Sequence, residues 1–85
     1  MMSVTVNFPA SLSHLAGQSV IVRESVSNVG QLIQALDRLA PGMAKELDDP
    51  LYNIAINQEI LLHSVDSRPV KDGDIVEVIP SIAGG

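Results

Sequence analysis

The stretch KDGDIVEVIPSIAGG, Lys71 to Gly85, contains the signals for a turn, a strand and a C-terminal tail. It opens on the turn Asp72 to Asp74, in which aspartate bonds back to local backbone and glycine accepts a positive φ. The hydrophobic run Ile75 to Ile79 predicts the last strand, and Pro80 ends its ladder pairing because proline has no N–H. The small residues Ser81 to Gly85 follow. Chain ends that are not tied down are usually mobile, so this stretch predicts a strand that runs into a flexible tail.

One segment has helical periodicity. Asn28 is a suitable N-cap, and Gln31 three residues later completes a capping-box pattern. Pro41-Gly42 ends the helix, and one further turn is expected over Met43 to Leu47. The apolar residues at i, i+3, i+4, i+7 and i+10, which predict one buried stripe, are Val29, Leu32, Ile33, Leu36 and Leu39.

Three other segments fit the two-residue period of a strand, in which successive side chains lie on opposite faces. They are Val4 to Phe8, Ser19 to Arg23 and Asn53 to Ile56. The residues between the first two, Ala10 to Gln18, suit a hairpin-like connection. The remaining segments are a tight turn at Asn57 to Glu59, an apolar run at Ile60 to Leu62 and a polar loop at Ser64 to Lys71.

The order of these elements predicts an α+β fold. Two strands, one helix and further strands form a mixed sheet packed on one main helix, because there is a single apolar helix stripe to bury. Parallel pairing of the first and last strands places the tail at one end of a central strand. We expect one domain over residues 1–80 and a flexible Gly-Gly tail over residues 81–85.

Composition excludes several functional classes. The 85 residues contain no cysteine, which excludes a cysteine nucleophile and cysteine-bound metal, so any sulfur must come from another molecule. The formal net charge of −5 predicts no binding of nucleic acid or of anionic membranes. His14 and His63 lack a third ligand at a recognisable spacing, so we expect no metal site. Because no segment resembles a signal peptide or a bilayer-spanning helix, we expect a cytoplasmic protein.

The C-terminal run resembles the signature of the ubiquitin-like sulfur carriers of bacteria and archaea. That signature is an Asp-Gly-Asp turn, a hydrophobic strand, a proline and a small-residue tail, as in Lys71 to Gly85. Asn28 to Ile33, Pro41 to Met43 and Asn53 to Asn57 extend the resemblance over most of the chain. The group includes the small subunit of molybdopterin synthase, the thiamine-biosynthesis sulfur carrier and the carrier that feeds a cysteine synthase. The resemblance implies the β-grasp, or ubiquitin-like, fold.

The same resemblance implies a reactive group. An ATP-dependent enzyme of the ubiquitin-activating type adenylates the carboxylate of Gly85, a sulfur donor converts it to a thiocarboxylate, and a downstream enzyme accepts the sulfur. Ser81, Ile82, Ala83 and Gly84 then form the tail that carries this group. The accepting enzyme is of the type of a molybdopterin synthase large subunit or a cysteine synthase. The chain itself is a carrier and substrate, not an enzyme, and has no cofactor of its own.

The sheet face away from the helix is the predicted docking surface. Its apolar residues are expected among polar neighbours, a combination that protein interfaces use. Ile79 and Ile82 are the strongest candidates because they adjoin the tail. Scattered surface aliphatics, which are normal, are the alternative. The apolar residues of this face are Ile21, Ala55, Ile75 and Ile79.

Two other functions stay open from the sequence alone. Gly85 could be joined to lysines of other proteins, which would make the chain a ubiquitin-like modifier. The chain could also be a plain interaction module with an incidental tail. The tail residues Ile79 to Gly85 depart from the aromatic-rich ending common in molybdopterin synthase small subunits and are more similar to the cysteine-synthesis carriers. This difference of a few residues leaves molybdopterin, thiamine, cysteine or another thiolated product open as the destination of the sulfur.

Overall fold

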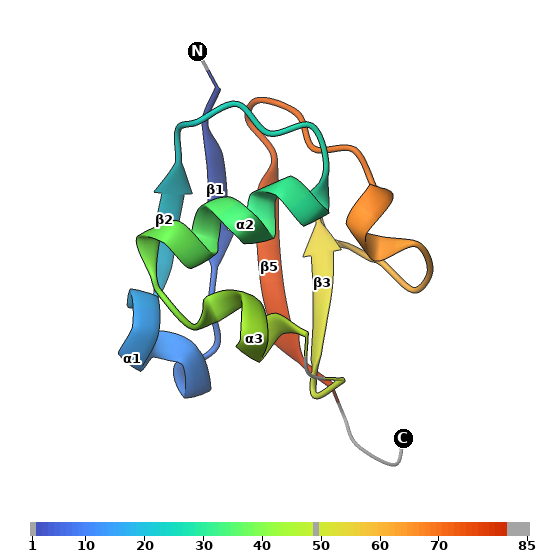
Figure 1. The fold of residues 1–85 in the computed structure, drawn as a ribbon. Helices are drawn as coiled ribbons and strands as arrows, with labels where there is room; N and C mark the ends of the chain where they lie inside the picture. Colours follow the sequence, from blue (N-terminus) through green and yellow to red (C-terminus); the bar gives the residue numbers. More distant parts are fainter. Residues whose placement is uncertain (1, 49, 82–85) are drawn as a thin grey trace.

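The computed structural model describes residues 2–48 and 50–81. Five strands form one mixed sheet in the order β2-β1-β5-β3-β4, and α2 and α3 cover one of its faces (Figure 1). The strands are β1 Val4–Asn7, β2 Ser19–Val22, β3 Tyr52–Ile56, β4 Glu59–Ile60 and β5 Ile75–Pro80. The helical segments are η1 Ala10–Leu12, α1 Ser13–Ala16, α2 Val29–Leu39, α3 Met43–Leu47 and η2 Val65–Ser67. This arrangement confirms the expected α+β fold.

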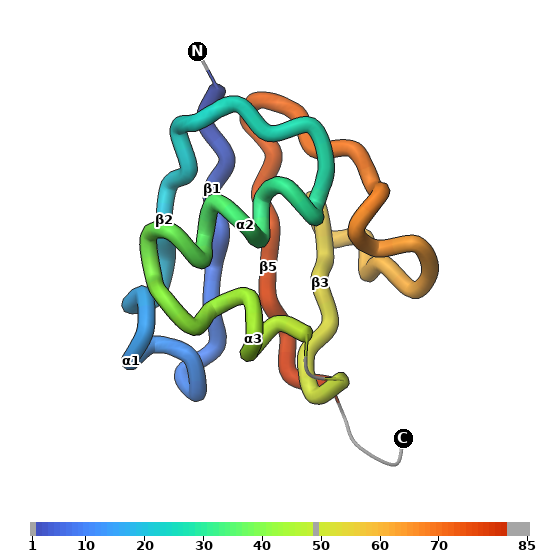
Figure 2. Tube along the Cα trace, in the orientation of Figure 1, coloured from blue at the N-terminus to red at the C-terminus, as the bar shows by residue number. Residues whose placement is uncertain are grey.

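The first and last strands pair in parallel at the centre of the sheet, as predicted. Val6 of β1 lies opposite Val76 of β5, and the two strands run side by side (Figure 2). β1 also pairs with β2, and β5 also pairs with β3, both in antiparallel fashion. Pro80 is still in register, opposite Tyr52, and is the last residue of β5. A neighbouring strand on each side therefore fixes the direction of β5.

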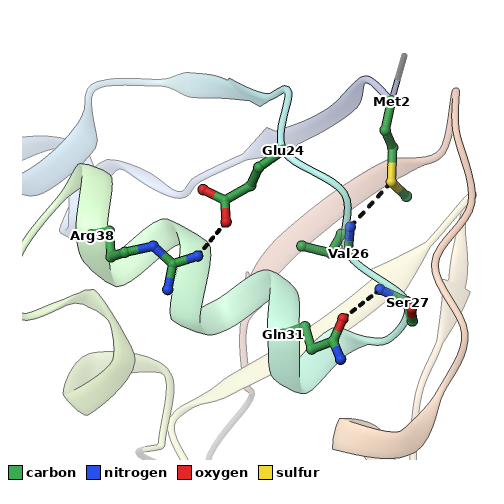
Figure 3. Close-up of polar contacts among 6 residues, drawn as sticks. All are labelled: Met2, Glu24, Val26, Ser27, Gln31 and Arg38. Atoms are coloured by element: carbon green, nitrogen blue, oxygen red, sulfur yellow. Dashed lines mark hydrogen bonds and ion pairs between the residues drawn. The ribbon is translucent and has the colours of Figure 1, made fainter.

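Helix α2 has the bounds and the cap that the sequence predicts. The Oδ1 of Asn28 accepts a hydrogen bond from the N–H of Gln31 at 2.8 Å. The Oε1 of Gln31 accepts one from the N–H of Ser27 at 2.7 Å (Figure 3). The side chain of Gln31 thus bonds one residue before the cap, a small variation on the capping box.

Two further contacts hold the connection between β2 and α2. Glu24 and Arg38 form an exposed ion pair, and the Sδ of Met2 accepts a hydrogen bond from the N–H of Val26 at 3.3 Å (Figure 3). Exposed ion pairs add little to stability, so the connection depends mainly on the burial of Val26, which is 6% exposed.

The sequence prediction is wrong for one residue of the buried helix stripe. Leu39 is 58% exposed, whereas Val29, Leu32 and Leu36 are buried. Leu39 follows Leu32 by seven residues, which is about 20° around the helix axis, so its angle alone would keep it on the buried face. It is the last residue of α2, and its side chain is exposed where the helix ends. Ala35, which the predicted stripe did not include, borders it on the same side as Leu39 and is fully buried.

The core lies between the sheet and α2. The sheet side chains that face α2 are buried in the core or pack partly buried against it, because successive side chains of a strand point to opposite faces. The loops also contribute, through Leu12 from η1, Met43 from α3, and Leu61 and Val70 from the segments that flank η2. The sheet residues are Val4, Val6, Phe8, Val20, Val22, Ile54, Ile56, Val76 and Val78.

Two connections differ from the sequence prediction. The hairpin connection between β1 and β2 contains η1 and α1, because Leu12 is 1% exposed and Leu15 packs against the core. The polar loop before β5 contains η2, where Val65 packs against the core in the same way. The extra turn predicted after α2 is confirmed as α3. Single leucine or valine residues among polar neighbours therefore produce short helices that periodicity cannot detect.

The turn before β5 attaches this strand to the start of β1. The N–H of Ser3 donates to the Oδ1 of Asp72 at 2.7 Å, and the carbonyl of Ser3 accepts from the N–H of Gly73 at 2.8 Å. Gly73 has a φ of 87°, a region that favours glycine, as predicted for this turn. These bonds set the parallel register at the point where β5 begins.

The same turn attaches β5 to the end of β3. The carboxylate of Asp74 accepts from the N–H of Lys71 at 2.8 Å and from the Nδ2 of Asn57 at 3.0 Å. The Oδ1 of Asn57 accepts from the N–H of Ile75 at 2.9 Å, and the N–H of Asn57 donates to the carbonyl of Ile75 at 2.8 Å. One carboxylate and one amide therefore join two strands that are adjacent in the sheet but distant in sequence.

We predict that Asp74→Ala lowers the free energy of unfolding by about 1–2 kcal/mol, because two donors lose their acceptor. Urea unfolding measures this loss. Asp66→Ala is the matched control: no hydrogen bond of the Asp66 side chain is found among the described residues, so its effect should stay below about 0.5 kcal/mol. Equal losses in the two variants would contradict a structural role for the Asp74 carboxylate.

Candidate functional site

A backbone hydrogen bond fixes the junction between β5 and the tail. The N–H of Ser81 donates to the carbonyl of Leu51 at 2.6 Å, immediately after the pairing of Pro80 with Tyr52. Ser81 is partly buried. The other predicted tail residues lie outside the described residues; they are Ile82, Ala83, Gly84 and Gly85. The root of the tail is therefore defined as a continuation of the central strand.

A side-chain hydrogen bond supports this root from the helix side of the sheet. The hydroxyls of Tyr52 and Ser11 lie 2.8 Å apart and share one hydrogen bond. It links β3 to the η1 segment that follows β1, next to the end of β5. The sequence analysis missed Tyr52. The signal was available, since Tyr52 alternates with the inward residues Ile54 and Ile56, and a half-buried tyrosine hydroxyl usually finds a partner.

The predicted docking residues share the sheet face away from the helices, which we call the open sheet face. Ile21, Thr5 and Ile75 form one row across three strands, and both isoleucines are 48% exposed. Ile79, two residues beyond Glu77 in β5, is partly buried. The open sheet face thus presents aliphatic side chains that lead along β5 toward the tail.

The exposed apolar residues of the open sheet face differ from the predicted set at two positions. Ala55 lies opposite Glu77 but is 1% exposed, so it underlies the surface and offers little of it to a partner. Ile60, opposite Ala55 on the edge strand β4, is 50% exposed. Sequence analysis did not propose Ile60, because a strand of two residues gives no alternation that assigns its side chain to a face.

The described residues contain neither a cluster of metal ligands nor a membrane-spanning helix. In residues 2–48 and 50–81, no group of three or more histidine, cysteine or acidic side chains is placed to hold a metal ion. His14 and His63 are both exposed, one in α1 and one before η2. Within the same ranges, no helix has the length and apolar character needed to cross a bilayer.

Comparison with known proteins identifies the family. The model of the ThiS family matches residues 6–85, which includes every strand of the sheet except the first two residues of β1. The chain therefore belongs to the ThiS family of ubiquitin-like sulfur carriers, as its C-terminal signature predicted.

Individual relatives agree with this assignment. The sulfur carrier protein CysO of Mycobacterium tuberculosis is 31% identical over 93 residues, which cover 99% of this chain and 100% of the relative. A chain in the crystal structure of the Amycolatopsis orientalis BexX/CysO complex matches with a TM-score of 0.81 and 26% identity, over 96% of this chain and 99% of that one. The small archaeal modifier protein 1 of H. volcanii has a TM-score of 0.80 at 19% identity, over 96% and 100%, and shares the fold. The fold is the expected β-grasp.

We predict that Tyr52→Phe and Ser11→Ala each lower the free energy of unfolding by about 0.5–1.5 kcal/mol, because each removes the same hydrogen bond. The double variant should lose no more than the larger single loss, since the two residues act through one interaction. Urea unfolding of the four proteins gives the coupling free energy. Fully additive losses would show that the two hydroxyls do not depend on each other.

Proposed function

We propose that this chain carries sulfur as a thiocarboxylate on Gly85. The observation that carries the proposal is the backbone bond from Ser81 to Leu51, which holds the tail root directly beyond the central strand. Membership of the ThiS family supports the same function. Because β5 pairs with a strand on each side, the position of Ser81 is fixed relative to the sheet. A partner that binds the sheet therefore also has the start of the tail in a fixed position.

The chemistry that we propose needs two displacements. A carboxylate oxygen of Gly85 attacks the α-phosphorus of ATP, pyrophosphate leaves, and an acyl adenylate forms. A sulfur donor supplies sulfide or persulfide sulfur, which attacks the carbonyl carbon, and the C–O bond to AMP breaks. With a persulfide donor, the remaining S–S bond must be reduced by a thiol before the thiocarboxylate is free. The partner enzymes catalyse these steps, and this chain supplies the carboxylate.

The two terminal glycines suit this role for a steric reason. Gly84 and Gly85 have no side chains, so a narrow channel can admit the carboxylate and bring the attacking atom close to it. Because glycine also accepts positive φ values, the tail can bend inside such a channel. A bulky residue at either position would obstruct both displacements.

We propose that the open sheet face docks the activating enzyme and, later, the sulfur-accepting enzyme. Ile21, Ile75 and Ile60 are each about half exposed, and Ile79 continues this surface toward the tail. The accepting enzyme is of the type of a molybdopterin synthase large subunit or a cysteine synthase, and we place the reaction in the cytoplasm, where ATP is available. The BexX/CysO complex supports the idea that carriers of this fold act in assemblies with a partner.

We predict that incubation with an activating enzyme of the ubiquitin-activating type, ATP and sulfide replaces one oxygen of Gly85 by sulfur. Intact mass spectrometry, followed by fragmentation of the C-terminal peptide, locates the change. A chain without Gly85 is the control and should keep its mass. If the wild-type chain instead forms conjugates with lysines of other proteins and no thiocarboxylate, the chain is a modifier and sulfur carriage is wrong.

We predict that Ile75→Asp lowers kcat/KM for this activation by about tenfold, because a buried aliphatic contact at an interface is worth about 1–2 kcal/mol. Leu39→Asp is the matched control, since Leu39 is 58% exposed at the end of α2 and does not lie on the sheet. It should change kcat/KM by less than about twofold. Urea unfolding of both variants separates docking from folding. Equal loss of activation in both would contradict docking through the open sheet face.

A further inference from the structure

A groove runs along the helix side of the molecule, away from the open sheet face. It consists of two hollows of about 380 and 200 Å³ that share the residues Ile33, Leu47, Asp48 and Asp66. Its lining residues place the larger hollow between α2 and α3, and those of the smaller one place it between α3, η2 and the start of β3. Figure 1 shows how α2, α3 and β3 are arranged. Volumes of this size admit one or two amino-acid side chains.

The floor of the groove is aliphatic. Ile33, Leu47 and Val65 are partly buried and pack against the core, and each keeps a surface toward the groove. Ile54 and Leu61 close the bottom of the smaller hollow and are 7% and 5% exposed. An aliphatic side chain that enters the groove therefore exchanges water for hydrocarbon contacts, which is favourable in proportion to the area that it buries.

The rim of the groove is acidic and unpaired. Asp48 at the end of α3 and Asp66 in η2 are both exposed, and neither carboxylate has a hydrogen bond or ion pair with another described residue. Lys45 also lines the larger hollow and takes part in no ion pair among the described residues. The carboxylates thus outnumber the cation, in a chain whose formal net charge is −5.

The walls of the groove are fixed before anything binds. Helix α2 and η2 touch so closely that a Cβ on Gly30 would lie 3.3 Å from the carbonyl oxygen of Asp66. The N–H of Val29 donates to the carbonyl of Arg68 at 3.0 Å, so the backbone joins the same two elements. A site with preformed walls loses little conformational entropy when it is occupied.

We propose that this groove binds a short segment of a partner protein in which a leucine-like side chain stands beside arginine. The aliphatic side chain lies between Ile33 and Leu47, and the guanidinium group pairs with Asp66 and Asp48. Arginine fits better than lysine, because its planar group donates to two carboxylates at once. The negative charge of the rim disfavours an acidic segment.

The position of the groove gives this interaction a role beyond the proposed sulfur chemistry. The groove and the open sheet face lie on opposite sides of the sheet, so both can be occupied together. The smaller hollow also includes Pro50 and Tyr52, which flank the carbonyl of Leu51 that holds Ser81. An occupant of the groove therefore lies beside the tail root without covering the docking face, and can keep a second protein in the same assembly.

The test uses the peptide acetyl-Arg-Leu-Arg-amide as the probe and acetyl-Glu-Leu-Glu-amide as its matched control. Backbone amide chemical shifts of the full chain are followed by NMR as each peptide is added. We expect saturable shifts at Gly30, Ile33, Leu47 and Asp66 with the basic peptide, and none at these residues with the acidic one. Shifts on the open sheet face alone, equal responses to the two peptides, or no saturable shift at all would each overturn the proposal.

Variants of the rim complete the test. The double variant Asp48→Asn, Asp66→Asn should weaken binding of the basic peptide by about fivefold, because exposed pairs are individually modest. Glu77→Gln, which removes a carboxylate from the open sheet face, should leave the affinity unchanged, and Lys45→Gln should not weaken it. The amide spectrum of each variant verifies its fold. If the double variant and Glu77→Gln weaken binding of the basic peptide equally, the peptide responds to the net charge of the chain. That result would refute specific binding in the groove.

Discussion

The parallel pairing of β1 with β5 is the contact on which the rest of the structure depends. It brings two ends of the chain together, with Val6 opposite Val76, and leaves the remaining strands to pair on the outer sides. A parallel connection cannot be made by a tight turn, so the chain must cross over the sheet, and α2 covers the core on the way. Because β5 lies at the centre, whatever follows Pro80 starts from the most constrained strand of the molecule.

Both ends of β5 are held by specific polar groups. At its start, Asp72 bonds to the backbone of Ser3, and Asp74 bonds through Asn57 to the end of β3. At its end, the carbonyl of Leu51 accepts from Ser81. The sequence feature that resembled a family signature thus has a structural explanation: the Asp-Gly-Asp turn sets the register of the strand, and the strand sets the origin of the tail. Under the proposed function, a partner that binds the sheet thereby fixes the point from which the reactive carboxylate extends.

Much of this could be predicted from the sequence, for identifiable reasons. The bounds of α2 followed from periodicity together with the cap at Asn28, and the parallel centre of the sheet followed from the order of the elements. Leu39 was misplaced because it is the last residue of α2, and apolar spacing alone does not show which end of a helix extends past the core. Short helices around Leu12 and Val65 were missed because their burial depends on neighbours that are distant in sequence. The low exposure of Ala55 and the identity of Ser11 as the partner of Tyr52 are likewise tertiary, and no local pattern encodes them.

The two sides of the molecule are suited to different contacts. The open sheet face carries half-exposed isoleucines in line with the tail, whereas the helix side carries an aliphatic groove with a carboxylate rim. Each extends, on its own side of the sheet, toward the tail root, where Ser81 bonds to Leu51. The central claim is that this anchored root sets the reach of Gly85 into the activating enzyme.

Deleting Ala83 tests that claim most directly, because it keeps the terminal Gly-Gly and lowers the greatest reach of the tail by about 3.4 Å. We measure the rate of thiocarboxylate formation at saturating activating enzyme. An anchored root predicts a loss of about tenfold or more, since small misplacements of a reacting group are costly. An unchanged rate would show that the position of Gly85 does not depend on the strand that precedes it.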